Sequence, residues 1–260
     1  MSDTETLEGT AEEGQRLAEA AKDAGLPLLL VGGVGVWVTC PSARGGALAR
    51  SYGDADFVGR ASDRKAITAF MTGQGYEPDK MFNAIHGATR LNYHDPARDR
   101  PIDVLLDKFV MAHALDLRDA LRSAAGAAGA GERLTLPLAD LLMTKLQVVS
   151  LNHKDLVDIC ALLLDHGFGE GPDDGTISMP RILAVTRSDW GFEHTIHRTL
   201  ATLRERIGEF ELPADGAATI VGHADELDTA LDAAPKSMAW KMRARVGERV
   251  KWYEEPEEAR

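Results

Sequence analysis

The sequence predicts an α+β (α/β) fold, in which a mixed β-sheet with flanking helices is followed by a helical C-terminal part. Short apolar runs bounded by glycine and turn residues, which are typical of strands, occur in the first half of the chain. From residue 137 onward, apolar residues recur almost throughout at helical spacing. We therefore expect a disordered acidic tail over residues 1–10, an α/β domain over 11–133 and a helical domain over 134–260.

The elements of the α/β domain follow from where each apolar pattern starts and stops. Gly25 and Pro27 end the first helix, and Ser62 is an acceptable N-cap for a later one. The elements expected are, in chain order, a helix over 11–24, a strand over 28–31, a helix starting in 34–40, a loop over 40–49, a strand over 54–58, a helix over 62–74, strands near 87–93 and over 102–106, a helix over 113–122 and a flexible small-residue loop over 123–131.

The C-terminal domain is expected to contain helices separated by one break rich in glycine and aspartate. These helices are predicted over 137–151, 153–166, 179–187, 190–209, 223–232 and 236–252, with the break over 167–175. The last helix carries several lysines and arginines between Trp240 and Trp252. We favour a solvated helix that pairs with acidic neighbours, and keep a docking surface for RNA or an acidic partner as the alternative.

Composition limits the classes of partner. The chain has 29 basic and 41 acidic side chains, a net charge of −12, which argues against a surface built for non-specific nucleic-acid binding. Cys40 and Cys160 match no zinc spacing and no disulfide framework, so a reducing cytoplasm is expected. The acidic N-terminus does not resemble a signal peptide, and the longest apolar run is broken by glycines and a proline, so we expect no membrane span.

Three aspartates carry the chemical argument. Asp54 and Asp56 are two residues apart in an extended segment, so their side chains project from the same face. Asp103 lies in another predicted strand, which could run alongside. Clustered carboxylates repel one another unless cations lie between them, and two Mg²⁺ ions (or Mn²⁺) are the natural occupants. Such a pair of ions is suited to in-line phosphoryl displacement.

Gly32 and Gly33 form the second element, directly after a strand and before a predicted helix. Glycines let the backbone approach a triphosphate, and the helix N-terminus offers unpaired N–H groups. A dinucleotide fingerprint is rejected because Val38 stands where its third glycine would fall. A glycine pair alone is weak evidence for phosphate binding, so the interpretation depends on the aspartates.

The order of these motifs resembles the polymerase-β-like nucleotidyltransferase superfamily, and within it the AbiEii-type toxin-like group. The resemblance covers roughly residues 28–166. Tyr52 departs from it, because a small hydroxyl residue is usual there. The matching segments are Gly32-Gly33, Arg50 before Asp54-Ala-Asp56-Phe57, Ile102-Asp103-Val104, the helix around Lys145, and Lys154-Asp155.

This resemblance implies a mixed sheet with the aspartates at one edge and a nucleoside triphosphate as donor. Asp54, Asp56 and Asp103 would be the catalytic metal ligands, with Asp103 helping to deprotonate the acceptor. Four further roles follow from the resemblance: phosphate cradling by Gly32 and Gly33, charge neutralisation by Lys145, positioning by Asp155 and phosphate contact by Arg50.

The function expected is metal-dependent transfer of NMP from an NTP to a hydroxyl on an RNA end, a protein or a small molecule. The resemblance also implies a toxin–antitoxin role, with an antitoxin protein as a possible partner. Two alternatives stay open: a catalytically weak nucleotide-binding or regulatory protein on the same fold, and a metal-dependent phosphohydrolase. The acceptor, the preferred NTP and the role of residues 170–260 are not specified by the sequence.

Overall fold

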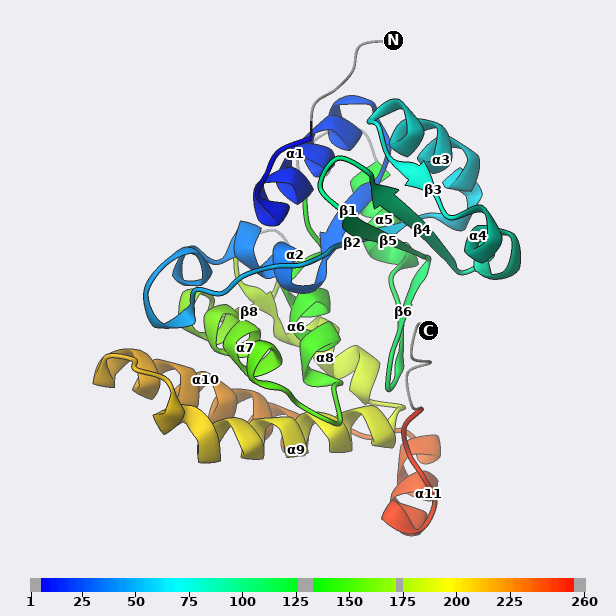
Figure 1. The fold of residues 1–260 in the computed structure, drawn as a ribbon. Helices are drawn as coiled ribbons and strands as arrows, with labels where there is room; N and C mark the ends of the chain where they lie inside the picture. Colours follow the sequence, from blue (N-terminus) through cyan, green and yellow to red (C-terminus); the bar gives the residue numbers. More distant parts are fainter. Residues whose placement is uncertain (1–5, 126–132, 172–174, 255–260) are drawn as a thin grey trace. The chain divides into compact units, whose positions relative to one another are not determined.

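The computed structural model of the chain describes residues 6–125, 133–171 and 175–254 (Figure 1). The chain divides into two units, and the predicted α+β class is confirmed. The first unit contains the five-stranded sheet and ends at Leu136. The second unit contains the chain from Pro137 onward together with Cys40–Arg50 and Val110–Leu115, two segments that the sequence assigns to the first domain.

The sheet of the first unit is mixed, with strand order β1-β2-β5-β4-β3. β2 and β5 are parallel, whereas the β1–β2, β5–β4 and β4–β3 pairs are antiparallel. Leu30 also makes an isolated parallel bridge to Thr135. The strands are β1 (Leu28–Val31), β2 (Ala55–Gly59), β3 (Glu77–Pro78), β4 (Arg90–Asp95) and β5 (Arg100–Leu106).

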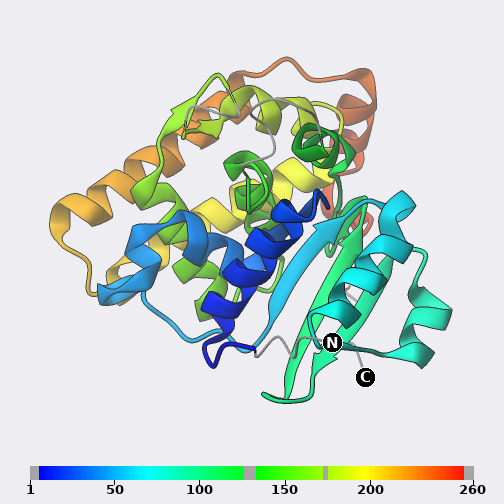
Figure 2. The same cartoon turned by 90° about the horizontal axis from the view of Figure 1, so that it is seen from above.

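One face of the sheet is the core. Strand residues such as Phe57, Tyr93 and Val104 are buried there against Leu17 of α1 and Ile67 of α3. Figure 2 shows α1 and α3 lying over this side of the sheet. The helices of the unit are α1 (Thr10–Asp23), α2 (Gly32–Thr39), α3 (Arg64–Gly73), α4 (Lys80–His86) and α5 (Arg118–Ala125).

Several local predictions for the first unit differ from the structure. Ser62 is not a helix N-cap, since it lies inside a 3₁₀ turn (Ala61–Asp63) before α3. The sequence interpretation missed α4. Asp79 is the N-cap of this helix, and its side chain accepts a hydrogen bond from the backbone N–H of Phe82. The predicted helix over 113–122 begins only at Arg118.

The chain between β5 and α5 forms two short strands, β6 (Lys108–Val110) and β7 (Ala114–Asp116). Part of the small-residue loop predicted over 123–131 belongs to α5, and the rest lies outside the described residues. The loop predicted over 40–49 contains two 3₁₀ turns, Pro41–Arg44 and Gly46–Leu48.

The predicted acidic tail is not wholly free of structure. Residues 1–5 lie outside the described part, but the carbonyl oxygen of Leu7 accepts a hydrogen bond from Arg100 (2.9 Å). The backbone N–H of Leu7 donates to the Glu13 carboxylate (2.9 Å), and Thr6 is buried. These contacts hold the segment before α1 on the first unit.

The second unit is helical, with buried apolar residues from α7, α9 and α10 at its centre. A short parallel pair, β8 (Phe168–Gly169) and β9 (Ile177–Ser178), lies at the predicted break. The predicted helix over 137–151 ends at Leu146, and that over 223–232 begins at Ala214. The helices are α6 (Leu138–Leu146), α7 (His153–Asp165), α8 (Met179–Thr186), α9 (Trp190–Arg206), α10 (Ala214–Ala233) and α11 (Met238–Val246). Within the described ranges, none of the helices is both long and apolar enough to cross a bilayer.

Candidate functional site

The turn between β1 and α2 brings backbone close to a carboxylate. Gly32 has φ +68°, a left-handed conformation that favours glycine. A Cβ built on Gly32 would lie 2.8 Å from Oδ2 of Asp56, which is closer than side-chain carbons approach such atoms. Gly33 follows in the first turn of α2. The glycine pair therefore allows both the sharp strand-to-helix turn and the close approach of Asp56.

Asp56 and Asp103 lie level with each other on neighbouring parallel strands. The register of β2 and β5 pairs Asp56 with Asp103, and it pairs the adjacent residues Ala55 and Ile102, which are buried in the core. Because side chains alternate along a strand, the two carboxylates project from the opposite, more exposed face. Asp54 is exposed and immediately precedes β2. Asp56 belongs to β2 and Asp103 to β5, the second and third strands of the sheet, rather than to an edge strand.

The Asp103 carboxylate is held by a bidentate ion pair with Arg90 of β4. Nε of Arg90 donates to Oδ1 (2.9 Å) and Nη2 donates to Oδ2 (2.6 Å). Asn92, which pairs with Asp103 in the β4–β5 register, donates its side-chain amide to Oδ1 (3.0 Å). Hydrogen bonding to Asp103 raises the pKa of the Arg90 guanidinium; burial opposes this rise, and the charges of Asp103 and Asp56 support it.

Asp103, one of the three predicted metal ligands, is ion-paired in the structure. Both oxygens of Asp103 accept a hydrogen bond from the Arg90 guanidinium, which uses lone pairs that would otherwise be open to a metal ion. In the described segments, no cluster of three or more His, Cys, Asp or Glu side chains has a geometry that could hold a metal. The two-ion site of the sequence interpretation stays a prediction, and no chemical step below depends on it.

The remaining predicted residues gather in the second unit around Asp158. Arg50 makes a bidentate pair with this carboxylate (2.8 Å for both contacts), and Lys145 Nζ lies 2.7 Å from Oδ2. Asp158 is fully buried, so two cations compensate one carboxylate that has lost its hydration. Asp158 is thus the centre of a buried ion cluster.

Asp155 lies at the start of α7 and has two contacts. It forms a capping box with Asn152, in which each side chain accepts a hydrogen bond from the other residue's backbone N–H. Its Oδ1 lies 3.6 Å from Lys145 Nζ. Asp155 therefore helps to cap the N-terminus of α7 and adds negative charge beside Lys145.

Sequence reasoning missed the partners of Asp103. Arg90 and Asn92 alternate with the apolar Leu91 and Tyr93, and this period of two indicates one polar strand face. The β4–β5 register, which the sequence interpretation did not assign, places Arg90 diagonally across from Asp103.

The basic C-terminal segment is used largely inside the second unit. Lys236 contacts the carboxylate of Glu193 (2.5 Å), and the ring N–H of Trp240 donates to the same carboxylate (3.1 Å). Arg243 caps the carbonyl of Gly247 and lies over the Trp190 ring. Because the tryptophans pack or donate internally, the structure favours the solvated, paired helix over a base-stacking platform.

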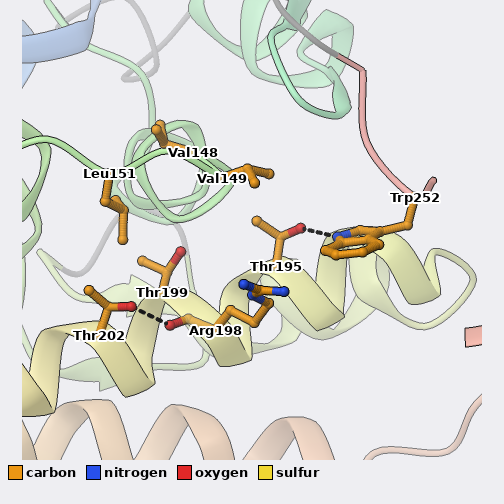
Figure 3. A pocket seen from close by; sticks show the side chains of 8 residues that line it. All are labelled: Val148, Val149, Leu151, Thr195, Arg198, Thr199, Thr202 and Trp252. Atoms are coloured by element: carbon orange, nitrogen blue, oxygen red, sulfur yellow. Dashed lines mark hydrogen bonds between the residues drawn. The ribbon is translucent and has the colours of Figure 1, made fainter. Parts of the chain in front are cut away.

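A small cavity lies beside α9 in the second unit (Figure 3). Its volume is about 50 Å³, enough for water rather than for a nucleotide. The Thr195 hydroxyl accepts a hydrogen bond from the ring N–H of Trp252 (3.1 Å), and Thr202 donates to the carbonyl of Arg198 (3.0 Å). A nucleotide therefore does not fit in this cavity.

A scan against models of known protein families finds no match to this chain, and a search of curated proteins finds no relative. The functional argument therefore depends on the residues themselves.

Proposed function

We propose that the chain is a nucleotidyltransferase that moves NMP from an NTP to an acceptor hydroxyl. The observation that supports this best is the adjacency of Gly32 and Asp56. The glycine turn opens α2 directly beside Asp56, which is level with Asp103 on the next strand. A backbone turn that a phosphate could approach thus lies beside two carboxylates on one face of the sheet.

The residues of the first unit suit an in-line displacement. The N–H groups at the start of α2 offer donors and a positive dipole end to the phosphates of the donor. The acceptor oxygen attacks the α-phosphorus, the bond to the pyrophosphate oxygen breaks, and the hydroxyl proton passes to a carboxylate. Asp54 and Asp56 are the carboxylates we assign to that proton and to alignment of the acceptor.

The resemblance to AbiEii-type proteins favours an RNA end or a protein as acceptor, with an antitoxin as partner. The net charge of −12 disfavours a long nucleic acid. We therefore propose a short or structured RNA end or a protein hydroxyl, with a small molecule as the remaining option. Mg²⁺ or Mn²⁺ is the proposed cofactor.

A second candidate is a nucleotide-binding protein with little catalytic power on the same scaffold. The Arg90–Asp103 pair favours it, because it engages the carboxylate that the resemblance assigns to metal binding. Under this candidate, nucleotide binds at the glycine turn but no NMP is transferred.

Transfer of label from α-³²P NTPs tests the proposal. Purified full chain is incubated with each common NTP, with Mg²⁺ or Mn²⁺, and with total RNA, protein extract or a small-molecule mixture. We expect labelled RNA or protein that disappears in Asp54→Asn and Asp56→Asn. Asp23→Asn, an exposed change in the same unit, is the matched control and should retain transfer.

Three results would separate the candidates. Nucleotide binding without transfer under any condition would support the second candidate. Release of phosphate without label transfer would indicate a phosphohydrolase. Labelling that is equal in Asp56→Asn and the wild type would exclude the proposed site.

A further inference from the structure

Resting on the proposed function, we infer that Arg90 is a phosphate-binding residue for the nucleoside triphosphate. In this assignment, the Asp103 carboxylate orients the Arg90 guanidinium instead of binding a metal ion. Arg90 lies outside the motifs that suggested the site, and its role follows from three observations on the exposed face of the sheet.

The first observation is the pattern of used and unused donors on Arg90. Nε and one N–H of Nη2 are directed to Asp103, which leaves Nη1 and the second N–H of Nη2. Toward residues 6–125, 133–171 and 175–254, Nη1 donates no hydrogen bond. The Arg90 side chain is 34% exposed, so its unused donors can reach a ligand. Such a planar pair of donors is suited to bidentate contact with a phosphate.

The second observation is that the guanidinium is held in one orientation. Asp103 accepts two hydrogen bonds from the guanidinium and a third from the side-chain amide of Asn92. The guanidinium carbon also lies 5.7 Å from the centre of the Phe82 ring. An arginine that is already fixed loses less conformational entropy when it binds a ligand. The Asp103 side chain is only 16% exposed, so it lies deeper in the structure than the Arg90 guanidinium that it holds.

The third observation is the position of this group relative to the glycine turn. Arg90 is diagonal to Asp103, Asp103 is level with Asp56, and Asp56 Oδ2 adjoins Gly32. The charge of Asp56 contributes to the raised pKa of Arg90, which is consistent with their proximity. A triphosphate bound at the start of α2 would thus extend along the face that carries the guanidinium.

Calorimetric binding of the non-hydrolysable α,β-methylene analogues of ATP and GTP tests this role. Each titration of the purified full chain is run once with EDTA and once with Mn²⁺. We expect Arg90→Ala to weaken analogue binding roughly 10- to 100-fold in both conditions, the loss of charge-assisted hydrogen bonds. Arg90→Lys keeps the positive charge but lacks the planar pair of N–H donors, so its affinity should lie between those of Arg90→Ala and the wild type.

Arg122→Ala is the matched control, since Arg122 is an exposed, ion-paired arginine of the same unit. It should bind as the wild type does. Asp103→Asn should weaken binding with EDTA as well as with Mn²⁺, because it releases the guanidinium. Circular dichroism and melting of each variant verify that the fold is kept, and Arg90→Lys provides the comparison if Arg90→Ala does not fold.

Two outcomes would overturn the inference while leaving the proposed function standing. Analogue binding unchanged in Arg90→Ala, with wild-type label transfer intact, would make Arg90 structural. Tighter analogue binding by Arg90→Ala with Mn²⁺, but not with EDTA, would mean that Arg90 blocks a metal site. Absence of both analogue binding and label transfer in the wild type would instead sink the proposed function itself.

Discussion

Asp56 on β2 approaches Gly32 so closely that a Cβ at position 32 would lie 2.8 Å from its Oδ2. This contact links the sharp turn after β1 to the row of carboxylates on β2 and β5. It also makes position 32 intolerant of any side chain, for steric and for conformational reasons.

We expect Gly32→Ala to destabilise the chain by roughly 1–3 kcal/mol, from left-handed strain plus displacement of Asp56. Urea unfolding measures the change, and label transfer should fall with it. Gly73→Ala is the control, because Gly73 lies in α3 with open space around it and no left-handed φ. Equal stability of the two variants would contradict the steric argument.

Asp158→Asn is expected to destabilise the chain by roughly 3–5 kcal/mol, because it leaves Arg50 and Lys145 largely buried without their shared counter-charge. The control is Asp225→Asn, which removes the more exposed partner of Arg204 and should cost about 1 kcal/mol or less. Thermal melting of both variants measures the difference. A mild effect of Asp158→Asn would show that the cluster is not structural.

Acid unfolding should report on Glu13, a buried carboxylate of α1. Burial alone would raise the pKa of Glu13, but hydrogen bonds from Arg16, Leu7 and Tyr76 hold it below the ordinary 4.5. A lowered folded-state pKa contributes stability that is present above the unfolded value and is lost as the pH falls through the folded value.

The stabilisation by Glu13 should therefore be complete at neutral pH and decline below about pH 4.5. Glu13→Gln should lower the free energy of unfolding by roughly 1–3 kcal/mol at pH 7. It should also reduce the dependence of that free energy on pH below pH 4.5. The measurement is urea unfolding at a series of pH values. Glu19→Gln, on the exposed side of the same helix, should leave both quantities unchanged; an identical pH slope in Glu13→Gln and the wild type would refute the argument.

The two cysteines should be inert in the folded chain. Cys40 and Cys160 are both fully buried, and burial raises the pKa of the Cys160 thiol to about 12. Thiolate is the reactive form, so a disulfide reagent such as DTNB should label neither residue under native conditions and both after denaturation. Rapid native labelling of either cysteine would show that the core around it opens.

Much of the local architecture could be predicted from the sequence. The strand before Gly32, the helix after it, and the alternation of Asp56 with buried neighbours all follow from patterns that span fewer than about ten residues. The helical second half follows for the same reason. Helix ends were less accurate. Ser62 was the expected N-cap but caps no helix, whereas Asp79 does cap one, and both residue types are acceptable N-caps by sequence.

The sequence by itself determined which residues are polar and which strand face they share. Tertiary structure decided what each of them contacts. Asp103 meets Arg90 only because β4 and β5 pair in one register, and Asp158 meets Arg50 across a separation of 108 residues. Hydrophobic periodicity is a local property that the chain carries everywhere, whereas a charge partner depends on how distant elements pack. That is why the carboxylates could be found in the sequence, while the guanidinium that holds one of them could be found only in the fold.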